Sequence, residues 1–338
     1  MPFPGVTKVL FTEGFNPGIS RIFVIFLYFV SMVTSPIVSA QMPPPVISAN
    51  DALRLSQPMP DEHGTISSSD GTCLFYRYWP ASAPWSGRTV LVLHGIGYHS
   101  GPYKVVADAL NPRGIDVYGL DARAHGLSCG KRGYIGTPAQ VADDIAAMMH
   151  LMRQRTGSKT FLVNDSMGCN YALDYAKSHS DEISGLVLLA PAFDIEKRQW
   201  FQPSSLLLLP YFVFAHRKAV INLVGHRLDE SSRDQTFIAS RRNDPLAYKK
   251  VSFGYLLDIK RLVANWKAAI APRIRMPLLI VQGGKDNVVS HKDCVRFEQL
   301  AASTDKQLKN YPDVYHTTLW DPETPKILQM LGDWILAR

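Results

Sequence analysis

Ser166 lies in the sequence Asn-Asp-Ser-Met-Gly, between an apolar run and a stretch with a helical pattern. A sharp turn between a strand and a helix can hold a serine hydroxyl above a sheet, where it can attack a carbonyl carbon. Gly168 suits such a turn, because the two backbones pass closely there. Asn164 stands where glycine is usual, and asparagine tolerates unusual φ angles better than most residues. The pattern predicts a nucleophilic serine.

A serine hydroxyl is a poor nucleophile unless a base takes its proton, and two later loops offer the partners. Asp286 follows an apolar run in the sequence Gly-Gly-Lys-Asp, and His316 follows the last predicted strand. We predict that His316 is the base and that Asp286 orients it and stabilises its charged form. Asp313, on the loop of His316, and Asp194 remain alternative acids.

A third loop could supply the donors that stabilise a developing negative charge. The sequence His-Gly-Ile-Gly at residues 94–97 follows another predicted strand and favours a tight turn. Such a turn would leave the backbone N–H of Ile96 free to act together with that of Met167. Two such donors stabilise the oxyanion of a tetrahedral intermediate. We predict this pair as the oxyanion hole, with His94 as a hydrogen-bonded turn residue and not a base.

The elements that must position these residues alternate along the chain. Nearly continuous Val/Leu runs at 89–93, 160–163 and 185–189 are typical of parallel strands buried on both faces. Further strands are expected at 73–79, 115–119, 278–282 and 307–311, and helices at 103–110, 138–155, 167–179, 292–302 and 325–336. The alternation predicts an α/β protein with a mostly parallel central sheet flanked by helices.

The alternation stops between residues 193 and 272, where no convincing strand is found. We predict an inserted helical cap there, with the core formed by residues 65–192 and 273–338. The apolar run at 205–214 is either core of the cap or the lining of an acyl tunnel. Residues 195–250 hold ten basic and five acidic side chains. This excess fits peripheral contact with an anionic membrane, with a solvated surface as the alternative, and no nucleic-acid docking element is present.

The N-terminal segment has the pattern of a targeting signal. Residues 22–33 form an apolar run that Arg21 precedes, and Val-Ser-Ala follows at 38–40. This predicts a signal peptide over residues 1–40, with an uncleaved membrane anchor or a buried helix as alternatives. Residues 41–64, rich in Pro, Ser and Asn, are expected to be a linker or arm. We therefore expect an exported protein, secreted or periplasmic, with a tether through 22–33 as the alternative.

The composition limits the remaining classes. The 338 residues carry a net charge of +7, with 46% hydrophobic and 19% charged residues. These values exclude a disordered chain, a collagen-like chain and a protein with many membrane spans. The four cysteines are widely spaced and match no zinc-binding pattern. An ion pair is expected to brace the turn that holds Asp121 and Arg123.

Taken together, these motifs resemble the α/β-hydrolase superfamily, and within it the monoacylglycerol lipase and lysophospholipase branch, which is serine aminopeptidase S33-like. The resemblance covers about residues 65–338 and rests on HGIGYHSG at 94–101, DARAHGLS at 121–128, DSMG at 165–168, NDPL at 243–246 and GKD at 284–286. It implies Ser166 as nucleophile, Asp286 as acid and His316 as base, with no metal and no cofactor. The family usually has Gly-His-Ser-Met-Gly-Gly at the serine, and this chain has Asn-Asp-Ser-Met-Gly-Cys.

The resemblance implies a serine hydrolase that cleaves carboxylic esters through an acyl-enzyme. The apolar and basic cap favours a single-chain lipid ester such as a monoacylglycerol or a lysophospholipid. Three alternatives stay open: a peptidase of the proline iminopeptidase type, which would need an acidic pocket for a free amine, a lipid acyltransferase, and a non-catalytic binding protein with the same fold. Epoxide and halide hydrolases need an aspartate in place of Ser166 and are disfavoured.

Overall fold

The computed structural model describes residues 62–156, 158–193, 221–222, 231–264 and 266–338. The predicted signal peptide or anchor, nearly all of the predicted arm, the apolar run at 205–214 and Asp194 lie outside these ranges. Among the described residues, no helix has both the length and the apolar character that crossing a membrane requires.

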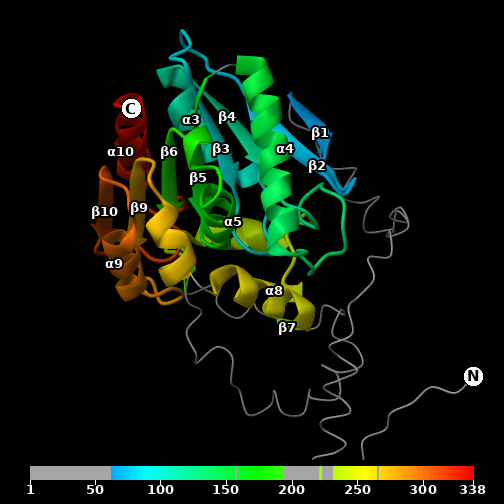
Figure 1. Cartoon of the computed structure of the whole chain (residues 1–338). Coiled ribbons are helices and arrows are strands. Elements are labelled where there is room, and N and C mark those ends of the chain that lie inside the picture. Colours follow the sequence, from blue (N-terminus) through cyan, green and yellow to red (C-terminus); the bar gives the residue numbers. More distant parts are fainter. Residues whose placement is uncertain (1–61, 157, 194–220, 223–230, 265) are drawn as a thin grey trace, which may run out of the picture. The chain divides into compact units, whose positions relative to one another are not determined.

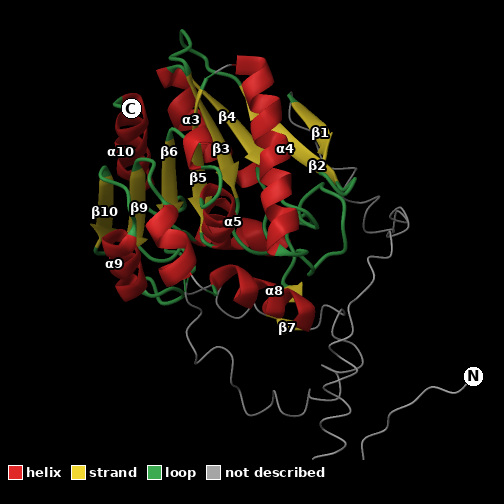
Figure 2. Ribbon diagram, viewed as in Figure 1, coloured by secondary structure: helices red, strands yellow, loops and turns green. Residues whose placement is uncertain are grey.

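The core is one eight-stranded sheet in the order β1-β2-β4-β3-β5-β6-β9-β10 (Figures 1 and 2). Strand β2 is antiparallel to both of its neighbours, and every other pair is parallel. The strands are β1 (His63–Ser67), β2 (Cys73–Trp79), β3 (Arg88–Leu93), β4 (Ile115–Leu120), β5 (Lys159–Asp165), β6 (Gly185–Leu189), β9 (Leu278–Gly283) and β10 (Lys306–Tyr311). The predicted α/β class with a mostly parallel sheet is confirmed.

Helices cover both faces of this sheet. On one face lie α4 (Pro138–Thr156), α5 (Met167–Ala176) and α9 (His291–Leu300), whose apolar side chains share one buried cluster. On the other face, α3 (Lys104–Leu110) and α10 (Thr324–Leu336) belong to a second cluster.

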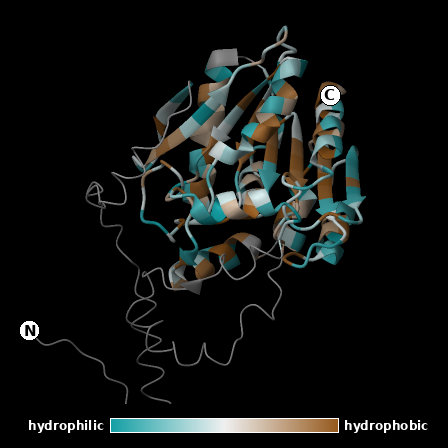
Figure 3. Ribbon diagram, turned by 180° about the vertical axis from the view of Figure 1, so that it is seen from behind, coloured by the Kyte–Doolittle hydropathy of each residue, from teal (hydrophilic) through white to brown (hydrophobic). Residues whose placement is uncertain are grey.

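Strand β3 shows why two clusters form. Leu91 and Leu93 belong to the first, and Val90 and Val92 to the second, because successive strand side chains point to opposite faces. Strands β4 and β6 are buried along their whole length. In Figure 3 the central strands are accordingly brown, whereas the edge strand β10 is mostly teal.

The described part of the cap contains α7 (Gln235–Asn243) and α8 (Phe253–Val263). Asp234 and Ser252 cap these helices by accepting hydrogen bonds from backbone N–H groups of their first turns. The expectation that the cap has no strand is wrong for one short element: β7 (Ile221–Asn222) pairs antiparallel with β8 (Lys250–Val251). A two-residue strand has too few side chains to show an alternating pattern.

Contacts place the cap beside the carboxyl ends of the parallel strands. The N–H of Tyr248 donates to the carbonyl of Gly97, which follows β3, at 2.9 Å, and Ser252 donates to the carbonyl of Gly133. Figure 1 shows α8 at this end of the sheet. Strand β1 begins at His63, two residues before residue 65, the predicted start of the core.

Candidate active site

Ser166 occupies the turn between β5 and α5 in a strained conformation, with φ 51° and ψ −111°. A non-glycine residue at positive φ is uncommon and is held there by its surroundings. The Ser166 N–H donates to the carbonyl of Leu189 at the end of β6, 2.8 Å away. The strain is thus at Ser166 itself and not at Asn164, which continues β5 and donates from Nδ2 to the carbonyl of Val187.

Gly168 allows the turn to approach strand β3 closely. A Cβ atom at this position would lie 2.3 Å from the carbonyl oxygen of Leu93 and 2.8 Å from that of His94. These are backbone atoms, so they cannot move aside as the end of a flexible side chain can. Glycine therefore fixes the separation between the Ser166 turn and the loop after β3.

Three side chains that are far apart in the sequence meet at this edge of the sheet. The Nε2 atom of His316 lies 3.0 Å from Oγ of Ser166, and its Nδ1 atom lies 2.9 Å from Oδ2 of Asp286. An ionised Asp286 can only accept a hydrogen bond, so Nδ1 of His316 carries the proton and donates it in that bond, which leaves Nε2 as the acceptor for the serine hydroxyl. This tautomer is the one that a general base requires.

The Asp286 carboxylate is held by several donors. Its Oδ1 atom accepts from the N–H groups of Val288 and Val289 at 2.8 and 3.1 Å, and its Oδ2 atom accepts from Nε2 of Gln282 at 3.0 Å. Burial by itself would raise the pKa of Asp286, but His316 and the two backbone donors outweigh it and lower that pKa. The group therefore stays ionised beside the imidazole.

The His316 imidazole lies between charges of opposite sign. Burial disfavours its charged form, but the charge and the hydrogen bond of Asp286, helped by the charge of Asp165, raise the pKa of His316 above its ordinary value. The Arg241 guanidinium acts in the opposite direction. The net effect favours proton uptake by this imidazole.

Asp313, one of the two alternative acids, does not occupy this place. Asp313 is exposed and forms an ion pair with Lys285 at 2.8 Å. Asp194 lies outside the described residues.

The predicted oxyanion donors lie on two turns that face each other. A Cβ atom at Gly95 would lie 3.5 Å from Cβ of Ser166, so the turn that carries Ile96 lies against the serine. The backbone N–H groups of Ile96 and Met167 donate to no other residue in the described part of the chain. Both donors are thus available to a ligand at Ser166.

Both ring nitrogens of His94 form hydrogen bonds with the backbone. Its Nδ1 atom donates to the carbonyl of Gly95 at 2.8 Å, and its Nε2 atom accepts from the N–H of Ala122 at 3.0 Å. Burial lowers the pKa of His94 to about 4, so the ring is neutral near pH 7. These contacts agree with the expected hydrogen-bonded turn residue.

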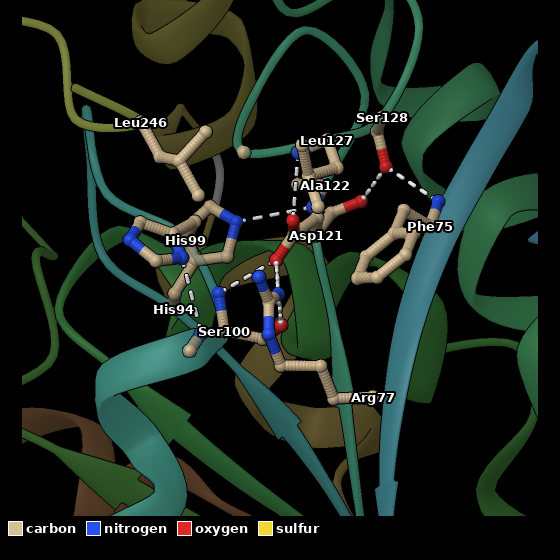
Figure 4. Close-up of polar contacts among 12 residues, drawn as sticks. Phe75, Arg77, His94, His99, Ser100, Asp121, Ala122, Leu127, Ser128 and Leu246 are labelled. Atoms are coloured by element: carbon tan, nitrogen blue, oxygen red, sulfur yellow. Dashed lines mark hydrogen bonds and ion pairs between the residues drawn. The ribbon is translucent and has the colours of Figure 1, made fainter. Parts of the chain in front are cut away.

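A buried carboxylate fixes the far end of the same loop (Figure 4). Oδ1 of Asp121 accepts from the backbone and the hydroxyl of Ser100 and from Nη1 of Arg77, at 2.7, 2.5 and 2.8 Å. Its Oδ2 atom accepts from the N–H of Leu127 at 2.8 Å. Burial opposes ionisation, but Arg77 and nearby histidines outweigh it and hold the pKa of Asp121 well below its usual range.

Arg123 braces a different part of the fold. Its guanidinium forms ion pairs with Asp144 at 2.6 Å and with Asp70 at 2.9 Å. The prediction of one ion pair bracing the turn is therefore not met in that form: Asp121 pairs with Arg77, and Arg123 pairs with Asp144 and Asp70, all outside the turn.

One buried pair at the site was not anticipated. The hydroxyl of Tyr103 donates to Oδ2 of Asp165 at 2.5 Å and accepts from the N–H of Gly95 at 3.1 Å. This chain of bonds ties the residue before Ser166 to the turn that carries Ile96. Burial raises the pKa of Asp165. The only signal in the sequence was that Asp165 departs from the family pattern.

Within the described ranges, no three His, Cys, Asp or Glu side chains are grouped so that they could hold a metal ion. The groups that this arrangement brings together are a hydroxyl, an imidazole, a carboxylate and two backbone donors.

Comparison with known proteins agrees with this geometry. The family model described as "Serine aminopeptidase, S33" matches residues 86–323. Human monoglyceride lipase is 30% identical over 287 residues, which cover 81% of this chain and 90% of that protein. An uncharacterized Escherichia coli protein, YnbC, is 28% identical over 82% of this chain, but the match spans only 47% of YnbC.

Among solved structures, a soluble variant of monoglyceride lipase from Saccharomyces cerevisiae, in complex with a substrate analog, has the same fold. Its TM-score is 0.70 at 22% identity, with 82% of this chain and 95% of that chain covered. The chain belongs to the serine aminopeptidase S33 family of α/β-hydrolases, in the branch of the monoacylglycerol lipases.

Proposed function

We propose that this protein is a serine hydrolase that cleaves single-chain lipid esters, such as monoacylglycerols or lysophospholipids, through an acyl-enzyme. The observation that carries the proposal is the 3.0 Å contact between Nε2 of His316 and Oγ of Ser166, on a serine held at positive φ. A serine with an oriented base in hydrogen-bond contact is the arrangement that nucleophilic catalysis needs.

Each residue has one role in this mechanism. Ser166 attacks the ester carbonyl while His316 takes its proton, and Asp286 stabilises the imidazolium that forms. The N–H groups of Ile96 and Met167 hold the oxyanion, and His316 then gives its proton to the departing alcohol. Water activated by His316 hydrolyses the acyl-enzyme and restores the serine.

Two observations support a lipid ester as the substrate. The human relative with 30% identity is named monoglyceride lipase, and it supports carboxylic ester hydrolysis by this chain. The predicted cap, residues 193–272, combines an apolar run with an excess of basic side chains. These features suit an acyl chain and, at the surface, peripheral contact with a lipid bilayer.

A fluorophosphonate probe tests the nucleophile directly. We expect the wild-type chain to be labelled and the S166A variant to be unlabelled. A matched control is S178A, which removes a serine from the loop after α5. Labelling of S166A to the wild-type extent would refute the assignment of Ser166.

A panel of monoacylglycerols with increasing acyl length tests the substrate class. We expect hydrolysis of long-chain esters by the wild type and none by S166A. A strict preference for acetyl or butyryl esters would reject the lipid part of the proposal and leave the esterase part standing.

We also propose that the chain is exported and that residues 1–40 act as a signal peptide or anchor. Mass spectrometry of the mature N-terminus after expression in the native host tests this. A start near Gln41 supports cleavage, and an intact N-terminus in the membrane fraction supports an anchor. An intact N-terminus in the cytoplasmic fraction would refute export.

A further inference from the structure

Arg241 is a cation beside the candidate catalytic residues that the mechanism above does not use. It lies in the last turn of α7, in the cap. Its Nη2 atom donates to the carbonyl of Ile96 at 3.0 Å, and its Cζ atom lies 4.5 Å from the centre of the Tyr98 ring. The guanidinium is thus fixed against the turn that carries the oxyanion donor.

Among the described residues, the guanidinium of Arg241 forms no ion pair. It is half-buried, and in the described part of the chain no carboxylate lies within 4.0 Å of it. A guanidinium has five N–H donors, and the bond to Ile96 uses one of them. By contrast, Arg77 and Arg123, which also lie near this end of the sheet, are each paired with buried carboxylates.

The positive charge of Arg241 acts on the candidate base, His316. Arg241 lowers the pKa of His316, which disfavours the imidazolium that must form when Ser166 attacks. An anion bound beside Arg241 would offset this effect. The negative charge of Asp165 acts in the opposite direction to Arg241, because it raises the pKa of the same imidazole. It does not form an ion pair with Arg241.

We propose that Arg241 binds an anionic head group and that the preferred substrate is an acyl ester of glycerol phosphate. This inference rests on the proposed esterase function and names its substrate class. The planar guanidinium fork matches the geometry of two phosphate oxygens, and a bound phosphate neutralises the charge beside His316. A neutral glycerol head group would leave that charge unpaired.

The test compares two esters that differ only in the phosphate: 1-oleoylglycerol and 1-oleoylglycerol 3-phosphate, each in mixed micelles of one neutral detergent. Release of oleate gives kcat/KM for each. We expect the wild type to prefer the phosphate ester. In R241Q, the ratio of the two kcat/KM values should fall about 10–100-fold, mostly through KM, because a charge-assisted hydrogen bond is lost.

Two further variants separate binding from other effects. R241K keeps the positive charge but lacks the planar guanidinium, so it should retain part of the preference for the phosphate ester. R275Q removes an exposed positive charge just before β9, at the opposite end of the sheet, and should leave the ratio unchanged. Added salt should lower kcat/KM for the phosphate ester more than for the neutral ester.

The outcomes distinguish this inference from the proposed function. If the wild type hydrolyses 1-oleoylglycerol but shows no preference for the phosphate ester, the head-group assignment is refuted and the esterase assignment stands. An equal loss on both esters in R241Q would show that Arg241 only positions the Ile96 turn, which also refutes the assignment. If neither ester is cleaved and no probe labels Ser166, the proposed function itself fails.

Discussion

Replacing Gly168 with alanine tests the geometry on which the site depends. Helix propensity alone predicts that G168A is more stable, since alanine is favoured over glycine by about 1 kcal/mol inside a helix. The structure predicts the opposite. The new Cβ atom would lie 2.3 Å from the carbonyl oxygen of Leu93, and Cβ atoms essentially never make contacts under 3.0 Å.

The magnitude follows from that distance. The end of β3 and the Ser166 turn must separate by at least 0.7 Å to bring the contact from 2.3 to 3.0 Å. Forced overpacking of this kind costs about 1–3 kcal/mol. The same shift moves the Ile96 turn relative to the serine. Because misplacement by about 1 Å can cost 10²-fold in rate, we expect kcat to fall roughly 10–100-fold.

The assay combines urea unfolding with hydrolysis of a p-nitrophenyl ester. G87A is the matched control, because Gly87 has φ +77° and open space around it. Alanine is strained there by about 1–2 kcal/mol, so this variant should lose stability and keep its kcat. A G168A variant that is more stable than the wild type and has a kcat within twofold of it would refute the reasoning.

Three further predictions follow from the contacts described above. D286N should lower kcat about 10⁴-fold while the thermal midpoint changes little, because Asp286 fixes the tautomer of His316; a loss under tenfold would contradict its role. The negative charge of Asp165 raises the pKa of His316, so D165N should lower that pKa. Because the neutral imidazole is the active base, the acidic limb of the pH profile of kcat/KM should move to lower pH. A limb that moves to higher pH would refute this sign. R123M leaves the buried Asp144 unpaired and should lower the free energy of unfolding in urea by about 3–5 kcal/mol. The double variant R123M/D144L should recover much of that loss. An unchanged urea midpoint in R123M would show that this ion pair contributes nothing to stability.

The strands and the meeting of the three distant side chains were predictable from the sequence for a physical reason. Parallel strands buried on both faces leave continuous apolar runs, and their carboxyl ends lie at one edge of the sheet. Ser166 and Asp286 each follow such a strand, and His316 follows the edge strand β10, which is parallel to β9 but is not an apolar run. Their proximity therefore follows from strand direction alone, without knowledge of any side-chain contact.

Contacts between side chains were less predictable. The bond between Tyr103 and Asp165 joins residues that are 62 positions apart, and no periodic pattern links them. Arg77 pairs with Asp121 because β2 and β4 are neighbours, a placement that the order of strands along the chain does not give. The edge strand β1 is not among the predicted strands, and its first two residues, His63 and Gly64, lie in the predicted arm.

The bonds between the cap and the loop after β3 also restrict how this protein can be re-engineered. His99 donates from Nε2 to Asp244 at 2.8 Å, and its Nδ1 atom accepts from the N–H of Gly101. Together with the backbone bond from Tyr248 to Gly97, this makes the predicted cap a structural support of the loop after β3. A chimera that receives the corresponding segment of another hydrolase will therefore need an acceptor at position 244. Without that acceptor, exchanging the cap to alter selectivity will also reduce turnover.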